Sequence, residues 1–437
     1  MRGAPRNFSA CRLTAAGTSA LLLQLLGAAA RAQVAQPQPV PDLIGPSARQ
    51  EEAGVGMRLG SFLFLPSLQL GEEFENNVFS THSDVHSDFI TIARPAFDLI
   101  SDWNVNAFAL HAEGDLAQYS KFTSENSGDI LVNAEGRLDI SYGQYLDVDA
   151  GFQSLHEERS SPDQLQSVLL AGGTAAKEPT QFIVETGDLR YVYSPGLIKL
   201  ELDGGIVAYE FTNTPTTNGG LAINSDRNRT EYTVTPRIGY EFLDGYQAYF
   251  QISGDRHQYQ ATFDASPERL RRDSSGYAAS VGIDVKVSAL ITGTFYAGYE
   301  GQYYDDPRLS TVEGAYFGGS LRWDPTESTE LKLTLSRQIS DTIVVGSSGF
   351  WDTQVSLNVD QKLIEDVHLN GTVTYINSDY QGSNLDDSQY DLKAGAVWTL
   401  NRYVDVNLSA EWLHQTSNQP INGFDQEIVQ LGLKLRL

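Results

Sequence analysis

Apolar and polar side chains alternate with a period of two along most of the chain from Ser61 to the last residue. In the clearest segment, 129–142, every second residue from Ile130 is apolar or small, while Glu135, Arg137 and Asp139 stand between them. Successive side chains of a β-strand point to opposite faces, so this segment has one apolar and one charged face. The alternation recurs at 146–153, 231–242, 330–335 and 390–400.

The connections between these segments are short and long in turn, which is typical of an antiparallel up-and-down meander. Short links rich in Gly, Pro, Asp and Asn are expected at 101–102, 143–144, 194–196, 243–245, 324–326 and 401–402. Long polar links are expected at 75–87, 120–128, 159–178, 213–228, 258–274, 304–311, 340–349, 378–387 and 415–424. The pattern predicts roughly 18 strands, with 16 as the alternative, because both ends of such a barrel lie on the side of the short turns.

A transmembrane barrel fits this pattern better than a soluble sandwich does. The apolar stripes are about 9–11 residues long, the span that a tilted strand needs in a bilayer. Charged residues stand in the middle of the opposite face, where a water-filled lumen tolerates them and a protein core does not. Closure also pairs every backbone N–H and C=O, as lipid requires. We therefore predict an all-β transmembrane barrel over 61–437, with short periplasmic turns and long extracellular loops.

Aromatic residues gather near the expected strand ends. Such residues commonly form girdles at the two membrane interfaces. The candidates are Trp103, Tyr142, Tyr145, Tyr193, Tyr246, Trp323, Trp351 and Tyr403.

The first 60 residues read as two separate segments. Arg2, Arg6 and Arg12 precede an apolar run, and Ala30-Arg31-Ala32 then offers a small-x-small cleavage pattern. We predict a secretory signal peptide over 1–32, with an uncleaved membrane anchor as the alternative. The proline-containing polar segment 33–60 is predicted to be an extended periplasmic tether.

Composition narrows the functional classes. The formal charge is −26, which argues against nucleic acid as a partner because phosphates need a basic face. The single cysteine, Cys11, lies within the predicted signal peptide, so disulfides, thiolate catalysis and cysteine-bound zinc are not expected in the mature chain. Nucleophile-elbow, phosphate-loop and His-Glu-x-x-His signatures are missing from the sequence. We therefore expect no enzyme, no catalytic residues, no cofactor and no metal.

Two loops leave a metal as an alternative. The acidic loop 384–387 could hold calcium at the cell surface, although a solvated turn is favoured there. The other loop is 75–87 with the start of the next strand. His82, Asp84, His86 and Asp88 alternate and would share one face of an extended segment. The favoured interpretation is a polar surface loop in which Asp88 caps the next strand.

The charged face of the strands predicts the lining of the pore. Acidic residues outnumber basic ones on that face, which favours cations or neutral solutes over anions. The alternative is that these charges pair across strands and stiffen a narrow or plugged wall. The pore-lining candidates are Glu135, Arg137, Asp139, Asp147, Asp149, Glu201, Asp203, Glu231, Arg237 and Lys332.

Several stretches resemble a proteobacterial outer-membrane β-barrel porin family whose members are often encoded in operons for exopolysaccharide biosynthesis and export. They are LPSLQLGEEFENNVFS (65–80), SDFITIARPAFDL (87–99), EERSSPD (157–163), RDSSGYAASVGI (272–283), GYEGQYYDD (298–306) and WDPTESTELKLTLSRQ (323–338).

The resemblance implies a Gram-negative outer-membrane pore for saccharides or small hydrophilic solutes. The alternatives are a non-conducting structural or assembly component of a surface-polysaccharide apparatus and, less favoured, an outer-membrane enzyme. Expected partners are outer-membrane lipids and lipopolysaccharide, polysaccharide export components, and the barrel-insertion machinery. That machinery reads the last strand, which here ends in Leu437 where such barrels commonly have Phe.

Overall fold

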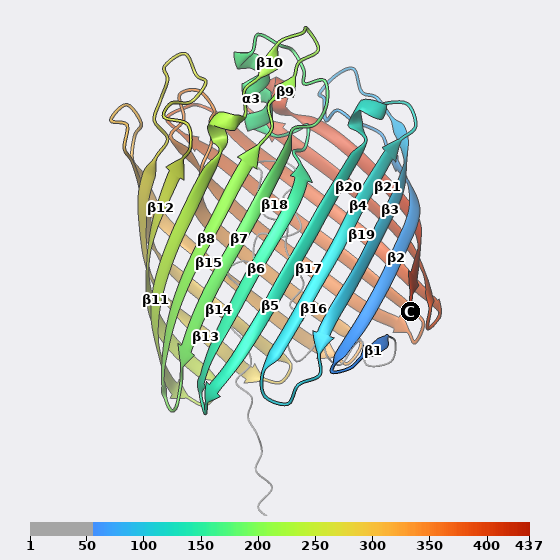
Figure 1. Ribbon diagram of the computed structural model, residues 1–437, viewed down its shortest axis with the longest axis vertical. Helices are drawn as coiled ribbons and strands as arrows, with labels where there is room; N and C mark the ends of the chain where they lie inside the picture. Colours follow the sequence, from blue (N-terminus) through green and yellow to red (C-terminus); the bar gives the residue numbers. More distant parts are fainter. Residues whose placement is uncertain (1–55) are drawn as a thin grey trace, which may run out of the picture.

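A computed structural model describes residues 56–437 of the protein. The predicted signal peptide and residues 33–55 of the predicted tether lie outside these residues. The described chain forms a closed antiparallel barrel of 18 strands, with one extra short strand at its edge (Figure 1). The predicted fold class and strand number are therefore confirmed.

Each barrel strand pairs with the next along the chain, and the last pairs with the first to close the cylinder. The strands are β2 (Phe62–Glu75), β3 (Asp88–Ser101), β4 (Ala107–Tyr119), β5 (Ser127–Ser141), β6 (Gln144–His156), β7 (Gln181–Tyr193), β8 (Ile198–Phe211), β11 (Arg229–Leu243), β12 (Tyr246–Tyr259), β13 (Ser274–Ser288), β14 (Ile291–Tyr304), β15 (Val312–Thr326), β16 (Thr329–Ser340), β17 (Gly349–Ile364), β18 (Val367–Gln381), β19 (Asp386–Asn401), β20 (Val404–Ser417) and β21 (Phe424–Arg436).

The end of the predicted tether is part of the sheet. Met57–Leu59 form strand β1, which pairs with Phe62–Phe64 of β2. Gly60, with φ of +66°, makes the turn between them, a conformation that glycine adopts without steric cost. The tether prediction is wrong for these residues because a glycine turn brings them back against the first barrel strand.

Long loops lie at one end of the barrel and short turns at the other (Figure 1). The loop 157–180 contains helix α3 (Pro162–Leu170), and the loop 212–228 contains β9 (Thr214–Pro215), β10 (Leu221–Ala222) and the 3₁₀ turn η2 (Ser225–Arg227). Two further 3₁₀ turns are η1 (Thr123–Glu125) and η3 (Pro420–Asn422). The turn predicted at 324–326 is displaced: β15 continues to Thr326, with a register shift after Trp323.

The two faces of the wall have opposite chemistry. Large apolar side chains of the outer face remain exposed, among them Leu433, Val281 and Leu202, because lipid would cover them. Polar side chains such as Gln153, Thr374 and Gln389 are buried on the inner face. No helix among residues 56–437 is long and apolar enough to cross a membrane.

Most of the predicted girdle aromatics are exposed, but two are not interfacial. Trp351 is buried against Val312 and Tyr316, because the top of the β16–β17 hairpin leaves the wall and folds inward. Tyr145 lies on the lumen face, where the Arg137 guanidinium stacks 4.5 Å from its ring centre.

Candidate functional site in the barrel lumen

The pore-lining candidates all lie on strands and have the parity of the inner face. Exposed apolar residues such as Leu138, Val148 and Ile238 alternate with them and point outward. The candidates belong to β5 (Glu135, Arg137, Asp139), β6 (Asp147, Asp149), β8 (Glu201, Asp203), β11 (Glu231, Arg237) and β16 (Lys332). That solutes pass along them stays a prediction.

Several of these residues form a row of alternating charge across β5 to β8. Arg137 lies directly opposite Asp147, which lies opposite Arg190, which lies opposite Asp203. The Asp147 carboxylate accepts hydrogen bonds from Arg137 Nε at 2.6 Å and Arg190 Nη2 at 2.7 Å. Such charge-assisted bonds across neighbouring strands hold the wall in register.

A second ion-pair group follows on β8, β11 and β13. Glu201 pairs with Lys199 and lies 3.4 Å from Arg237 Nε, and Arg237 also pairs with Asp284. The Arg237 guanidinium lies 3.4 Å from the ring centre of Tyr249. These contacts agree with the alternative in which lumen charges stiffen the wall.

A neighbouring row has carboxylates facing one another. Glu135 lies opposite Asp149, and Asp149 lies opposite Asp188. The Asn133 amide donates to Asp149 at 3.0 Å and to Glu135 at 3.4 Å. Like charges directly opposite are destabilising in a sheet, so this row contributes a negative field to the lumen at some cost in stability.

Two candidates lie near the short turns. Asp139 is exposed, two residues before the end of β5. Lys332 is exposed on β16 and lies opposite Arg322 of β15 and Asn358 of β17.

Glu231, His257 and Asp341 bring ligand atoms within 4.8 Å of one another, which is close enough for a metal. However, Arg229 Nε lies 2.7 Å from Glu231 and 3.5 Å from Asp341, where it would repel a cation. His257 Nδ1 is 2.8 Å from Asp341, and the Tyr259 hydroxyl donates to the same carboxylate. Burial alone would raise the pKa of Asp341, but the nearby charges of His257 and Arg229 hold it below its ordinary value. The cluster is best described as an ion-pair network that anchors Asp341 to the wall.

The end of the barrel that carries the long loops is called the mouth here. A small polar chamber of about 90 Å³ lies inside it, against the loop-side ends of β2 to β6. Its charged lining is mostly acidic, and Arg94, Arg159 and His156 are the basic residues that line it. The acidic lining residues are Glu73, Glu75, Asp115, Glu125, Asp129, Glu157 and Glu158.

The loop that carries His82, Asp84 and His86 is held in place by Asp88. Its carboxylate accepts hydrogen bonds from the backbone N–H groups of Phe89, Lys121 and Phe122, at 2.8 to 3.0 Å. The His86 ring packs edge-on against Phe79 and Phe122. These contacts tie the loop to its neighbour and give Asp88 the capping role expected of it.

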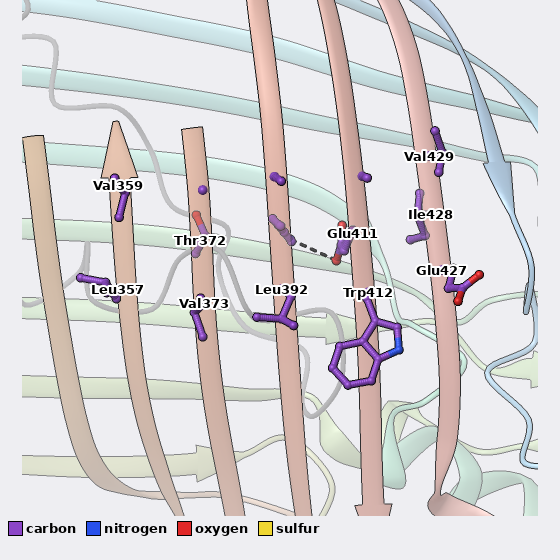
Figure 2. A pocket seen from close by; sticks show the side chains of 14 residues that line it. Leu357, Val359, Thr372, Val373, Leu392, Glu411, Trp412, Glu427, Ile428 and Val429 are labelled. Atoms are coloured by element: carbon purple, nitrogen blue, oxygen red, sulfur yellow. Dashed lines mark ion pairs between the residues drawn. The ribbon is translucent and has the colours of Figure 1, made fainter. Parts of the chain in front are cut away.

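A groove of about 630 Å³ lies on the wall formed by β17 to β21 (Figure 2). Small outward-facing residues, Gly371, Ala394 and Ala410, form its floor, and Leu392 and Trp412 flank them. The groove opens on the apolar outer face, so it belongs to the surface that contacts lipid and not to the lumen.

Some lining and loop residues were missed from the sequence. Arg190 and Asp188 lie on the inner face of β7, and the alternation of Asp188, Arg190 and Val192 with Leu189 and Tyr191 could have identified them. The buried loop residues Asp163, Arg227 and Arg272 carried no periodic signal, because their contacts join segments that are far apart in the chain.

Several known structures are similar to this chain at low sequence identity. The siderophore receptor PiuA from Acinetobacter baumannii is 9% identical, with a TM-score of 0.43, over 88% of this chain and 82% of that one. OpdL from Pseudomonas aeruginosa is 10% identical, with a TM-score of 0.42, over 87% and 99%. OccK2 (OpdF) from the same organism is 10% identical, with a TM-score of 0.44, over 86% and 98%. No curated protein matches the sequence.

A match to a sequence family identifies the family of this chain. The family described as "Putative beta-barrel porin 2" matches residues 52–437, which include every barrel strand and the last residue. The chain belongs to this porin family.

Proposed function

We propose that the protein is a passive outer-membrane channel for small hydrophilic solutes, with a preference for cations and neutral molecules such as saccharides. The observation that carries the proposal is the closed barrel with an apolar outer wall and a polar, acid-rich inner wall. Facing carboxylates such as Glu135 and Asp149 create a negative field in the lumen, which attracts cations and repels anions.

Conductance measurements test this proposal. The purified, folded protein in planar bilayers should give stepwise currents, and a salt gradient should give a reversal potential of the sign for cations. Liposome swelling with neutral saccharides then asks whether sugars pass. A folded sample that conducts no ions and passes no sugars would contradict the proposal. Fractionation against outer-membrane marker proteins tests the location.

A second candidate is a non-conducting component of a surface-polysaccharide apparatus. Two observations favour a barrel that does not conduct. The loops 157–180 and 341–348 meet inside the mouth, and ion pairs such as Arg137–Asp147 link neighbouring strands on the lumen face. Co-purification with periplasmic export proteins, without any current in bilayers, would favour this candidate over the channel.

We propose no catalytic role. The histidine rings at 111, 156, 257 and 414 each have a ring nitrogen against a carboxylate, of Asp98, Asp129, Asp341 and Asp425 respectively. These contacts are hydrogen bonds between side chains of the wall and of the strand ends. We expect assays with ester and glycoside substrates on purified protein to show no turnover.

A further inference from the structure

The loop end of the β16–β17 hairpin, beyond Arg337 of β16, leaves the barrel wall. β16 pairs with β15 only as far as Arg337, opposite Phe317, although both strands continue beyond this pair. Beyond Arg337 the chain turns inward: the N–H of Ile339 donates to Glu300 on β14 at 2.6 Å, and Asp341 reaches His257 on β12. The loop 341–348 therefore lies inside the mouth rather than above its own strands.

A second loop meets it from across the barrel. The loop 157–180 joins β6 to β7, and β8 with β11 to β15 separate this pair from β16 on one side of the cylinder. Helix α3 begins at its cap Ser161, whose hydroxyl accepts from Gln164 N, and Pro162 occupies the first turn. This start places Asp163 at the helix end that approaches the loop 341–348.

The contact between the two loops is made of hydrogen bonds. The Asp163 carboxylate accepts from the Thr342 hydroxyl at 2.6 Å and from Ile343 N at 3.1 Å. The side-chain oxygen of Gln166 accepts from Val345 N at 3.3 Å. Asp163, Thr342 and Ile343 are each at most 4% exposed, so water competes weakly for these bonds.

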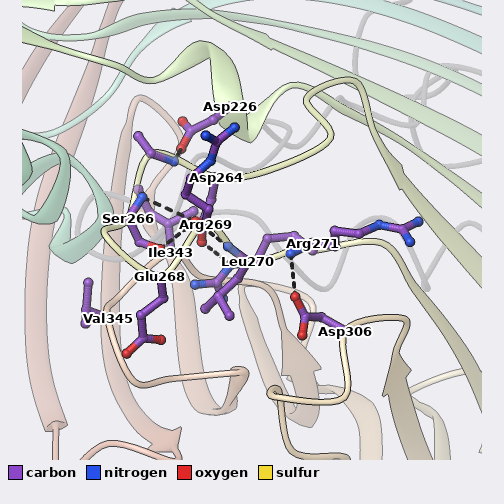
Figure 3. A network of polar contacts seen from close by, with 12 residues as sticks. Asp226, Asp264, Ser266, Glu268, Arg269, Leu270, Arg271, Asp306, Ile343 and Val345 are labelled. Atoms are coloured by element: carbon purple, nitrogen blue, oxygen red, sulfur yellow. Dashed lines mark hydrogen bonds and ion pairs between the residues drawn. The ribbon is translucent and has the colours of Figure 1, made fainter.

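Each loop is also tied to its own side of the mouth. Arg272, from the loop 260–273, donates to the carbonyls of Thr342 and Ser347 at 2.8 and 2.9 Å. Figure 3 shows this loop, with Asp264 and Leu270, beside Ile343. Arg227 in η2 forms a two-pronged pair with Glu157 at the start of the other loop. The bridge between Asp163 and Thr342 thus joins two loops whose bases are separately held.

We propose that the loops 157–180 and 341–348 form a gate in the outer mouth, with the contact of Asp163 to Thr342 and Ile343 as its latch. The proposal rests on the channel function proposed above. The structure corresponds to the latched state, and separation of the two loops opens the passage. Because the latch consists of a few hydrogen bonds and not of a large apolar core, substitutions at Asp163 or Thr342 shift the balance between the two states.

Two variants break the latch, and two matched variants keep parts of it. Asp163→Ala removes the acceptor of both hydrogen bonds, and Thr342→Val removes one donor at nearly constant volume. Thr342→Ser keeps the hydroxyl, and Asp163→Asn keeps an acceptor oxygen without the charge. One lost hydrogen bond shifts an equilibrium by about fivefold, so we expect the open probability to rise about fivefold in Thr342→Val and more in Asp163→Ala. Thr342→Ser should resemble the wild type.

Single-channel recording on the full chain, together with hydrogen exchange at the amides of Ile343 and Val345, tests the gate. Faster exchange and a higher open probability in Asp163→Ala and Thr342→Val support it. Wild-type open probability or unchanged exchange in both variants, with normal currents, overturns the gate and leaves the channel function standing. An absence of current in the wild type and in every variant overturns the channel function, and the gate with it.

Discussion

Arg190 on β7 lies directly opposite Asp147 on β6, and their side chains form a 2.7 Å ion pair that faces the lumen. Arg137 on β5 binds the other side of the same carboxylate. One acidic residue therefore links three strands, and its single negative charge lies between two positive charges on the lumen face.

Removing this carboxylate should weaken the wall and change the field. Asp147→Ala leaves the guanidinium groups of Arg137 and Arg190 without their shared acceptor. We expect a loss of roughly 1–3 kcal/mol in the free energy of unfolding, the net value of hydrogen bonds to charged groups, reduced where water screens them. Ion selectivity should move toward anions. Urea unfolding in lipid vesicles and reversal potentials measure both effects.

Asp139→Asn is the matched control, because Asp139 is exposed near the turn. If both variants were equally stable and equally selective, the ion-pair row would have no special role.

A substitution at Glu135 tests the row of facing carboxylates, in which neighbouring side chains repel one another. Glu135→Gln removes one charge from the row in which Glu135 faces Asp149, while its amide oxygen can still accept from Asn133. Relief of repulsion between facing like charges should leave the unfolding free energy equal or raise it by roughly 0.2–1 kcal/mol. Cation preference should fall. Glu72→Gln on the outer face is the control, and equal reversal potentials for the two variants would count against a conducting path past Glu135.

The strands of the wall were predictable from the sequence because successive residues of a strand face lipid and the lumen in turn. The lipid side requires apolar side chains, and the lumen side accepts polar ones. At Leu138 and Val148 the chain must be apolar, and at Arg137 and Asp147 it can be charged, so alternation reveals the strand and both faces. The girdle prediction for Tyr145 was wrong because it relied on the position near a strand end; the parity that Tyr145 shares with Asp147 would have placed it in the lumen.

The mouth was not predictable in this way. Asp163 and Thr342 are 179 positions apart, and no periodicity relates the two loops that carry them. Trp351 was expected at the interface because it is an aromatic residue near a strand end. It is buried because the hairpin that carries it bends inward, a consequence of contacts from Glu300, Arg272 and Asp163 that act on neighbouring residues.

A charge on the outer wall should impair assembly. Leu433 lies on the lipid face of β21, between Leu70 of β2 and Val406 of β20. Leu433→Asp places a carboxylate in the apolar band, at a cost of roughly 1–3 kcal/mol that depends on depth. We expect less folded protein in a lipid-vesicle assay read by heat-dependent electrophoretic mobility. Lys434→Gln, one residue on and facing inward, should fold normally, and equal folding of the two variants would mean that the faces are assigned wrongly.

Acid should favour the closed gate. Burial raises the pKa of the Asp163 carboxyl above its ordinary value of 3.8, and the charge of Arg227 offsets part of this rise. Glu157, Thr342, Ile343 N and Tyr380 are the other groups that act on it. The buried, latched carboxyl thus binds a proton more tightly than the exposed one does. Closure therefore gains stability as the pH falls from the raised pKa toward 3.8, and loses it as the pH rises through the raised pKa.

The open probability of the wild type should accordingly decrease as the pH falls through the raised pKa of Asp163. Asp163→Asn cannot titrate and should lose this dependence, while Asp84→Asn, at an exposed position of another loop, should keep it. Asp341 does not confuse the measurement, because its lowered pKa keeps it ionised over this range. A wild-type pH profile in Asp163→Asn would assign the response to another group and remove Asp163 from the pH sensitivity of the gate.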